Sequence, residues 1–380
     1  MKTLGLIAAI SVCVLTSSAN TNHFVYFGTY TSGKSKGIYV SRFDPRSGKL
    51  SEPELATETK NPNFLAVHPM RTSLYAVGEM TDTQGKRSGA VNAYSLDVKT
   101  GKLAALNQQS SGGSGPCHVS VDATGKSLLV ANYGSGSVAS LPIRTDGNLS
   151  EPASTIQHIG SSVNPKRQTA PHAHFITPSP DNRFALACDL GLDKVLIYRL
   201  DATSATLTPH QPAFGTSQPG FGPRHLAFSA GGKFIYVINE LSLNVSVFAY
   251  DTNSGAMNEI QSTSSLPAGY TITEKDSAAH ILAHPNGRFV YASNRGHDSI
   301  AVFSVEAKTG KLTLIQNEST QGKTPRNFAI DPSGRWLLAL NQNSDSVVVF
   351  AIDDETGKLK PTGQTINVGS PVCAVFVKTR

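Results

Sequence analysis

The sequence has few cysteines and few charged side chains for its length. Its 4 cysteines in 380 residues are too sparse for a disulfide framework. Charged residues make up 16% of the chain, which excludes the strongly charged compositions of disordered segments and coiled coils. The net charge of +6 is spread without a basic run, so nucleic acid is not expected as a partner. A small anionic molecule suits this mild positive surplus better.

Motifs for metals and cofactors are also missing. His172 and His174 have the spacing of a metal-binding pair, but no further ligands accompany them and no HExxH motif occurs. The Gly-Lys-Ser string at residues 125–127 is not a phosphate-binding loop, because Ser120 stands where the first glycine of that motif is required. We therefore expect no metal and no cofactor.

The first nineteen residues have the pattern of a secretory signal peptide. Lys2 precedes an apolar stretch at residues 4–15, shorter than the ~20 residues that span a membrane, and Ala19 ends a run of small residues suited to cleavage. Cys13 lacks the small preceding residue of a lipidation site. We expect a signal peptide at 1–19, a mature domain at 20–380 in the periplasm or outside the cell, and no membrane attachment after cleavage. Three cysteines remain in apolar, strand-like segments, which predicts buried thiols at Cys117, Cys188 and Cys373.

The rest of the chain repeats one phrase, in which two short apolar runs flank a tight turn and the second run ends in a polar residue. Six copies begin at residues 61, 115, 171, 222, 278 and 324, and a truncated seventh begins at residue 370. Equivalent positions in successive copies lie 46 to 56 residues apart, and they are Phe64, His118, His174, His225, His280, Asn327 and Cys373. A period of about 50 residues is the length of a propeller blade.

Each repeat predicts four antiparallel strands and no helix. The apolar runs have strand length. A third, alternating run follows, and in four places it leads into a Ser- or Thr-Gly-Lys-Leu turn, whose glycine supplies left-handed backbone. The N-terminal segment from residue 24 matches strands two to four of a blade, and residues 374–377 match a first strand. Joined, they complete one blade and leave no free sheet edge. The sequence therefore predicts an all-β, seven-bladed β-propeller that is a monomer.

Hairpin geometry brings polar residues to one mouth of the central channel. Residues equally distant from a hairpin turn lie side by side, and Arg224 and Glu240 are eight residues either side of Gly232. The same reasoning places at this face His118, His174, Asn294, Arg295 and Arg326. Arginines near a narrow channel favour an anionic ligand, although an internal Arg224–Glu240 ion pair and purely structural histidines remain alternatives.

Five phrases carry a resemblance to a known family: FGTYTSGKSKGIYVSRFDPRSGKL, NPNFLAVHP, PHAHFITPSPDNRF, GPRHLAFSAGGKFIYVINEL and SNRGHDSIAVF. Together with the rest of the mature chain they resemble the seven-bladed propeller lactonases, which include bacterial 6-phosphogluconolactonases and fungal 3-carboxy-cis,cis-muconate cyclase. The resemblance implies an active site of one His, two Arg and one Glu. The matching residues are His174 (or its neighbour His172), Arg224, Glu240 and Arg295. We expect substrate contacts from His118, His172, Asn294 and Arg326.

The leading hypothesis is hydrolysis of a sugar lactone such as glucono-δ-lactone or 6-phosphogluconolactone. The arginines would polarise the lactone oxygens, Glu240 would take a proton from water, and His174 would give one to the leaving ring oxygen. The signal peptide favours an unphosphorylated sugar. A carboxy-muconate cycloisomerase that uses the same groups, or a non-catalytic ligand-binding propeller, are the alternatives.

Overall fold

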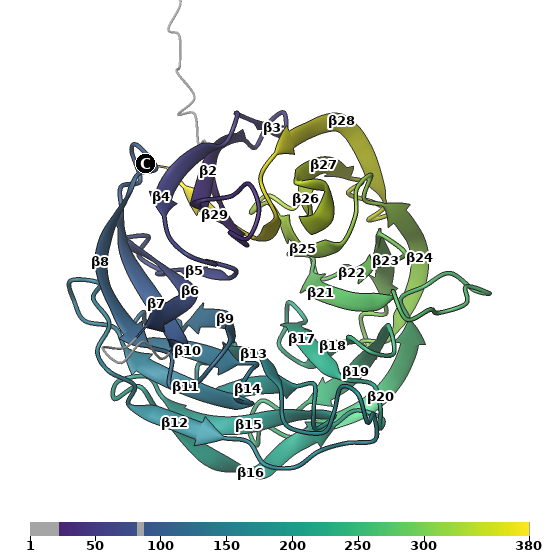
Figure 1. Ribbon diagram of the computed structural model, residues 1–380. Helices are drawn as coiled ribbons and strands as arrows, with labels where there is room; N and C mark the ends of the chain where they lie inside the picture. Colours follow the sequence, from purple (N-terminus) through teal and green to yellow (C-terminus); the bar gives the residue numbers. More distant parts are fainter. Residues whose placement is uncertain (1–22, 82–86, 380) are drawn as a thin grey trace, which may run out of the picture.

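The computed structural model describes residues 23–81 and 87–379, so the predicted signal peptide lies outside the described residues. In this part of the chain, seven antiparallel sheets stand around a central axis and form a closed ring (Figure 1). The one helical element among them is a short 3-10 turn, η1 (Gln342–Ser344). No helix of the described residues is long and apolar enough to cross a membrane. The predicted seven-bladed β-propeller is confirmed.

The blades follow one another along the chain. The strands of the second, third and fourth blades are β5 (Leu65–Val67), β6 (Ser73–Thr81), β7 (Arg87–Leu96), β8 (Leu103–Ser110), β9 (Pro116–Val121), β10 (Ser127–Asn132), β11 (Ser137–Pro142), β12 (Ser154–Gln157), β13 (Ala173–Pro178), β14 (Phe184–Asp189), β15 (Lys194–Asp201) and β16 (Thr206–Thr216).

The fifth, sixth and seventh blades have the same four-stranded order. Their strands are β17 (Pro223–Phe228), β18 (Phe234–Asn239), β19 (Asn244–Tyr250), β20 (Met257–Ser264), β21 (Ser277–Ala283), β22 (Phe289–Arg295), β23 (Ser299–Val305), β24 (Leu312–Ser319), β25 (Pro325–Ile330), β26 (Trp336–Asn341), β27 (Ser346–Ile352) and β28 (Leu359–Asn367).

The first blade joins the two ends of the chain. Its inner strand is β29 (Pro371–Lys378), which pairs antiparallel with β1 (His23–Thr29). Outside β1 lie β2 (Gly37–Asp44), β3 (Lys49–Leu50) and β4 (Glu54–Glu58). The pairing runs from His23 opposite Lys378 to Thr29 opposite Pro371, so the predicted closure is confirmed.

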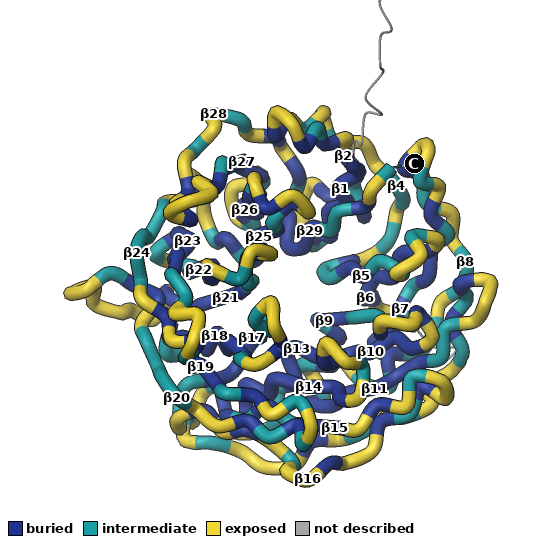
Figure 2. Tube along the Cα trace, turned by 180° about the vertical axis from the view of Figure 1, so that it is seen from behind, coloured by how far each residue is buried: buried dark blue, intermediate teal, exposed yellow. Residues whose placement is uncertain are grey.

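The hydrophobic core is divided into seven clusters, each between two neighbouring blades. The cluster between the fifth and sixth blades contains Ile238 and Val245 from one blade and Val290 and Phe303 from the other, all with no exposed surface. Figure 2 shows the resulting pattern, with buried segments in the ring interior and exposed segments at its turns. Burial of one such side chain contributes about 1.5–3 kcal/mol to the stability of the fold. Each blade is therefore stabilised mainly by its packing against the two neighbouring blades.

The repeated Gly-Lys turns pack against the preceding blade. Gly101 and Gly310 have φ of +78° and +70°, the left-handed backbone that the sequence predicts. A Cβ on Gly101 would lie 2.8 Å from the Phe24 ring, and one on Gly310 would lie 2.3 Å from the Phe234 ring. The glycine is therefore required both for the backbone conformation and for close packing against an aromatic ring.

Candidate active site at the channel mouth

A cavity of about 450 Å³ lies at one mouth of the channel. Four of the residues predicted from the sequence line it, and they are His174, Glu240, Arg295 and Arg326. Arg224 lines a smaller hollow that adjoins the cavity and shares His174 and Arg326 with it. The structure therefore brings all four residues that the family resemblance implies, with Arg326, to one place.

The hairpin formed by β17 and β18 delivers the central ion pair. Pro223 pairs with Asn239 and His225 pairs with Ile238, so Arg224 is the extra residue of a β-bulge and lies beside the strand end that Glu240 follows. Nε of Arg224 lies 2.9 Å from Oε2 of Glu240, and the two side chains are only 2% and 7% exposed. The internal Arg224–Glu240 ion pair, one of the alternatives left open by the sequence, is thus present, and it lies beside an open cavity.

Glu240 is surrounded by three guanidiniums. Besides Arg224, Nη2 of Arg295 lies 3.0 Å from its Oε2, and Nη2 of Arg167 lies 2.6 Å from its Oε1. Burial alone would raise the pKa of Glu240, but Arg295 and Arg224 outweigh it and hold that pKa well below its usual range. The cluster of three cations and one carboxylate keeps a net positive charge facing the cavity.

This low pKa changes the role that the sequence suggests for Glu240. A carboxylate held ionised by three arginines is a weak proton acceptor, because protonation would leave the cations without a counter-charge. Its hydrogen bonds instead fix the planes of the guanidiniums, whose remaining N–H groups can face a ligand oxygen. The geometry favours Glu240 as a positioning residue for the arginines.

His174 is the cavity residue best placed to move a proton. It lies on β13, is 4% exposed, and lines the cavity. Burial first, and the Arg224 cation next, hold the pKa of His174 well below its usual range, so the imidazole is neutral. Its Nδ1 lies 3.8 Å from Sγ of Cys117. A low pKa makes the neutral imidazole a weak base and its protonated form a strong acid, so His174 suits a proton that it holds only briefly during a reaction and then gives up.

The structure does not bring His118 and Asn294 to the cavity. His118 is 3% exposed and packs against Phe64 and Phe175, with ring centroids 4.2 and 4.0 Å away. Asn294 has no exposed surface, and its Nδ2 donates to the backbone oxygen of Ser265, 2.9 Å away. We correct the expectation that these two residues contact substrate, since both side chains are occupied inside the ring.

In several blades, the asparagine at the end of the second strand forms a side-chain hydrogen bond to the backbone of an earlier segment. Asn132 and Asn341 are equally buried, and each donates from Nδ2 to a backbone oxygen about 20 residues earlier in the chain, at Ser111 and Thr320. Asn294 has the same role, which explains its recurrence in the repeats. An asparagine that recurs at the same position in several blades is thus a poor guide to a ligand site.

His172 and Tyr133 form one wall of the site together. The His172 ring stacks on the Tyr133 ring at 4.4 Å and 15°, and His172 Nδ1 lies 3.0 Å from the Tyr133 backbone oxygen. Tyr133 lines the cavity, whereas His172 lies behind it. Of the two histidines in the PHAH phrase, His174 is therefore the one that faces the cavity.

Arg167 is a site residue that the sequence analysis missed. It lies between β12 and β13, in residues 158–172, the longest connection between neighbouring blades among the described residues. Gln168 anchors this loop, because it has no exposed surface and donates from Nε2 to the Leu190 backbone oxygen at 2.8 Å. Arg167 then reaches Glu240 and the Tyr133 hydroxyl, 3.3 Å away.

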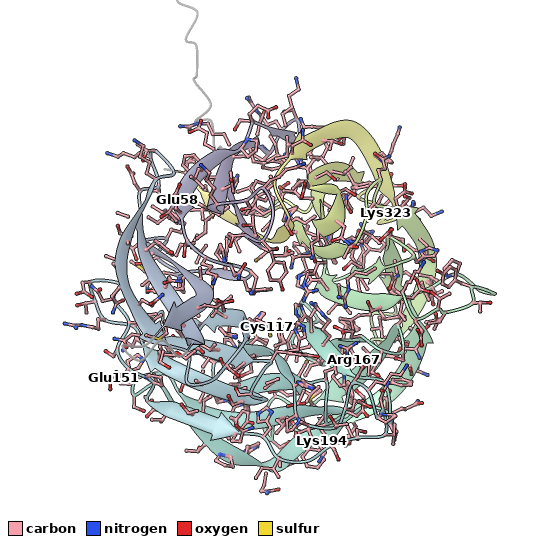
Figure 3. All side chains as sticks on the ribbon, in the orientation of Figure 1. Glu58, Cys117, Glu151, Arg167, Lys194 and Lys323 are labelled. Carbon is pink, nitrogen blue, oxygen red and sulfur yellow. The ribbon has the colours of Figure 1, made fainter. Side chains whose placement is uncertain are left out.

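The three described cysteines are free thiols. Cys188 and Cys373 are buried, as predicted, but Cys117 is half-buried and lines the cavity (Figure 3). Burial raises the pKa of the Cys117 thiol to about 12, so this group is neutral. Within residues 23–81 and 87–379, no three His, Cys, Asp or Glu side chains are grouped as metal ligands.

The molecule is a closed seven-bladed propeller with a cationic pocket and a neutral histidine at its channel mouth. These are the features that the resemblance to the propeller lactonases implies. Residues 24–376 match the family described as Lactonase, 7-bladed beta-propeller, and the chain belongs to that family. The resemblance found in the sequence is thereby confirmed.

Individual relatives agree over nearly the full length. The chain is 40% identical over 358 residues to the 6-phosphogluconolactonase of Bacillus subtilis (strain 168), covering 94% of this chain and 99% of the relative. It is 35% identical over 312 residues to a 6-phosphogluconolactonase of Formosa agariphila, covering 81% and 86%. It is similar to the structure of the periplasmic gluconolactonase PpgL of Pseudomonas aeruginosa, with 38% identity, a TM-score of 0.88, and coverage of 95% and 100%.

Proposed function

We propose that this protein is a lactonase that hydrolyses a sugar lactone, such as glucono-δ-lactone or 6-phosphogluconolactone, to the open acid. The observation that carries the proposal is the grouping of Arg224, Arg295 and Arg167 around Glu240, beside the neutral His174, at one cavity. The names of the related 6-phosphogluconolactonases and gluconolactonase support this reaction. They do not favour the cycloisomerase alternative.

The cations supply the main stabilisation of the reaction. When water adds to the lactone carbonyl, negative charge develops on the carbonyl oxygen, and guanidinium N–H groups at the cavity stabilise it. Arg295 is 13% exposed and held by Glu240 and by the Ala278 backbone oxygen, so it need not reorganise during the reaction. Arg326, which lies over the Tyr30 ring at 5.6 Å, adds a further cation at the cavity wall.

His174 moves the proton in this proposal. Its neutral imidazole takes a proton from the attacking water, and the imidazolium gives that proton to the ring oxygen as the carbon–oxygen bond of the lactone breaks. The products are one carboxylic acid and one hydroxyl of the same sugar, and the histidine returns to its neutral form. Glu240 remains ionised throughout and holds the arginines in place.

Two parallel assays test the proposed reaction. Wild-type protein should release acid from glucono-δ-lactone or 6-phosphogluconolactone faster than the spontaneous rate, and it should leave the ultraviolet absorbance of 3-carboxy-cis,cis-muconate unchanged. Loss of that absorbance without lactone hydrolysis would instead identify a cycloisomerase. A non-catalytic binding propeller would do neither.

Variants of the ion pair test the site. Arg224→Lys keeps the charge but loses the planar fork, and Glu240→Gln removes the charge that anchors three arginines, so each should slow turnover by roughly 10²-fold or more. Lys126→Arg, in the exposed turn between β9 and β10, is the control and should leave turnover unchanged. Normal turnover by correctly folded Glu240→Gln would contradict the site.

We further propose export from the cytoplasm as a mature domain of residues 20–380. The pattern of residues 1–19 supports this, as does the likeness to a periplasmic gluconolactonase. Mass spectrometry of the exported protein should find Asn20 at its N-terminus and no lipid. A retained Met1, or a lipid on Cys13, would contradict the proposal.

A further inference from the structure

Two histidines inside the channel form a hydrogen-bonded pair that takes no part in the proton transfer assigned to His174. His225 and His280 are 2% and 7% exposed and belong to β17 and β21, the inner strands of neighbouring blades (Figure 1). Nδ1 of His225 lies 2.8 Å from Nδ1 of His280. On the other side of the ring, Nε2 of His225 lies 3.2 Å from Nη1 of Arg224. The His225 imidazole therefore bridges His280 and Arg224.

Irregular strand pairing brings these side chains together. On a regular strand, neighbouring residues point to opposite faces, so Arg224 and His225 would diverge. Arg224 is the extra residue of the bulge on β17, and both it and His225 line the smaller hollow that adjoins the cavity. The pairing of β21 with β22 is also irregular at His280, whose amide donates to Oγ of the buried Ser293 at 3.0 Å. The backbone thus fixes both imidazoles beside Arg224.

The donors and acceptors in this chain of hydrogen bonds allow one arrangement of protons. A guanidinium only donates, so Nε2 of His225 accepts from Arg224 and carries no proton. The His225 imidazole then carries its proton on Nδ1, and this N–H donates to Nδ1 of His280. His280 must in turn carry its proton on Nε2. A second proton on His225 would direct an N–H at the guanidinium, and a proton on Nδ1 of His280 would direct two N–H groups at each other.

The electrostatics of the channel agree with this arrangement. Burial first, and the Arg224 cation next, lower the pKa of His225 well below its usual range and that of His280 to about 3. Both imidazoles are therefore neutral at pH 7, and each carries the single proton that the hydrogen bonds require. The hydrogen-bond partners determine which nitrogen holds that proton.

The His225 imidazole supplies one of the three bonds that hold the Arg224 guanidinium. Nε of Arg224 donates to Oε2 of Glu240 at 2.9 Å, and its Nη1 donates to the Ala279 backbone oxygen and to Nε2 of His225. These bonds use the Nε–H and both hydrogens of Nη1. The N–H groups of Nη2 are outside this set and can face a ligand oxygen in the adjoining hollow. Without the His225 acceptor, one buried N–H would lose its partner and the guanidinium could turn.

We propose that His225 and His280 are positioning residues that hold Arg224 in the orientation needed to stabilise the lactone oxyanion. The inference rests on the proposed lactonase function and adds two residues to it. Neither imidazole contacts the substrate in this role. His280 keeps the proton of His225 on Nδ1, so that Nε2 presents a lone pair to Arg224. Because a displacement of about 1 Å in the reacting geometry can cost about 10²-fold in rate, a fixed acceptor for Arg224 contributes to turnover.

Packing alone would need only an aromatic ring at this place. By strand pairing, Phe175 of the fourth blade occupies the position that His225 occupies in the fifth. Phenylalanine is thus compatible with the fold there, and His225→Phe removes the acceptor while keeping a ring. His225→Gln and His225→Asn form a matched pair, because a glutamine amide reaches the position of Nε2 whereas an asparagine amide reaches only that of Nδ1.

Nuclear magnetic resonance of the imidazole nitrogens tests the proton arrangement. In wild type with isotope-labelled histidine at about pH 7, His225 should be protonated on Nδ1 and His280 on Nε2, with signals assigned by their loss in His225→Phe and His280→Phe. In His280→Phe, which removes the acceptor of the Nδ1–H, His225 should exchange between its two tautomers. A His225 imidazolium, or a proton on Nε2 of His225 in the wild type, would overturn the proposal.

Steady-state kinetics test the positioning role. His225→Phe should lower kcat for lactone hydrolysis by roughly 10–10²-fold with little change in KM, because it misplaces a group that acts in the transition state. His225→Asn should show a similar loss, whereas His225→Gln should restore kcat to within roughly 5-fold of wild type. His118→Phe is the control and should leave kcat unchanged, because the His118 ring packs against Phe64 and Phe175.

The outcomes separate this inference from the proposed function. Normal kcat in folded His225→Phe, or equal kcat in His225→Gln and His225→Asn, would overturn the positioning role while leaving lactone hydrolysis intact. If His225→Phe does not fold, the glutamine and asparagine pair and the wild-type tautomers still decide. A wild type that hydrolyses no lactone would contradict the proposed function, and with it the role of the pair, whichever tautomers are found.

Discussion

Two regions of the molecule are similarly buried but differ in polarity. The interfaces between neighbouring blades are apolar, whereas the central channel carries charged and polar side chains. Between blades, positions such as Phe303 and Val290 have no exposed surface and belong to a hydrophobic cluster. At the channel, Arg224, Glu240 and His280 are 2%, 5% and 7% exposed, yet they are charged or polar. Burial of such groups costs free energy, which the interfaces between blades must offset. The contrast separates positions selected for stability from positions selected for chemistry.

Loss of the closing strand should have the largest effect on the interfaces. Removing residues 371–380 exposes the edge of β1 and deletes Cys373 and Val377 from the core between the first and second blades. We expect loss of the cooperative thermal transition and aggregation, measured by circular dichroism and size-exclusion chromatography. A truncated protein that stays monomeric with an unchanged Tm would contradict the closure.

A single large-to-small change inside one interface should have the next largest effect. Phe303→Ala leaves a cavity between the fifth and sixth blades and should lower the free energy of unfolding by about 3–5 kcal/mol. Because Phe303 is remote from the cavity lining, the KM for lactone should not change. Denaturant unfolding and lactone kinetics check both statements, and Phe303→Leu should show the smaller loss of a volume-conserving change. A raised KM in Phe303→Ala would contradict the claim that changes at a blade interface affect stability without affecting the channel site.

Acid should weaken the channel rather than the interfaces. Burial first lowers the pKa of His118, His174 and His225 well below 6.5, and it lowers that of His280 to about 3. Between these values and 6.5 the unfolded chain binds protons that the folded chain does not, so stability falls as the pH drops below about 6.5. Each histidine adds a slope of about 1.4 kcal/mol per pH unit.

The variant His280→Gln isolates one of these slopes. Denaturant unfolding of this variant and the wild type, from about pH 7 to pH 5, should show a difference in pH slope that grows from about 0.3 kcal/mol per unit at pH 7 to about 1.4 kcal/mol per unit below about pH 5.5, with the lower slope in the variant. The comparison of slopes removes any constant effect of the substitution on packing. Identical slopes would mean that the pKa of His280 in the folded protein equals its value in the unfolded chain, and would contradict this prediction.

The same contrast explains how far the sequence could predict the molecule. The blades follow from local pattern, because strand alternation and turn glycines such as Gly101 recur with the repeat. The Arg224–Glu240 contact follows too, because a hairpin fixes which residues are neighbours. The contact of Arg167 with Glu240 could not be predicted, because Arg167 lies outside the repeated phrases, on the connection between β12 and β13. The two residues are 73 positions apart in the sequence.

Asn294 and Glu240 were identified from the sequence, but the orientation of the first and the role of the second were not. Position alone placed Asn294 at the channel face, but which way a strand-end side chain turns depends on its partner, here the Ser265 backbone. The sequence identified Glu240 correctly as part of the cluster, but not its role as an anchor. That role depends on how many cations surround the carboxylate, which only the three-dimensional arrangement reveals.

The most direct test of the central claim compares two buried histidines of the channel. His174 lines the cavity and His118 does not, although both are nearly fully buried. The measurement is kcat for lactone hydrolysis in His174→Asn and His118→Asn, each with its Tm. Our account predicts a loss of roughly 10²-fold or more in kcat for His174→Asn with a Tm within about 3 °C of wild type, and near-normal kcat for His118→Asn. Normal turnover in His174→Asn, or an equal loss in both variants, would contradict it.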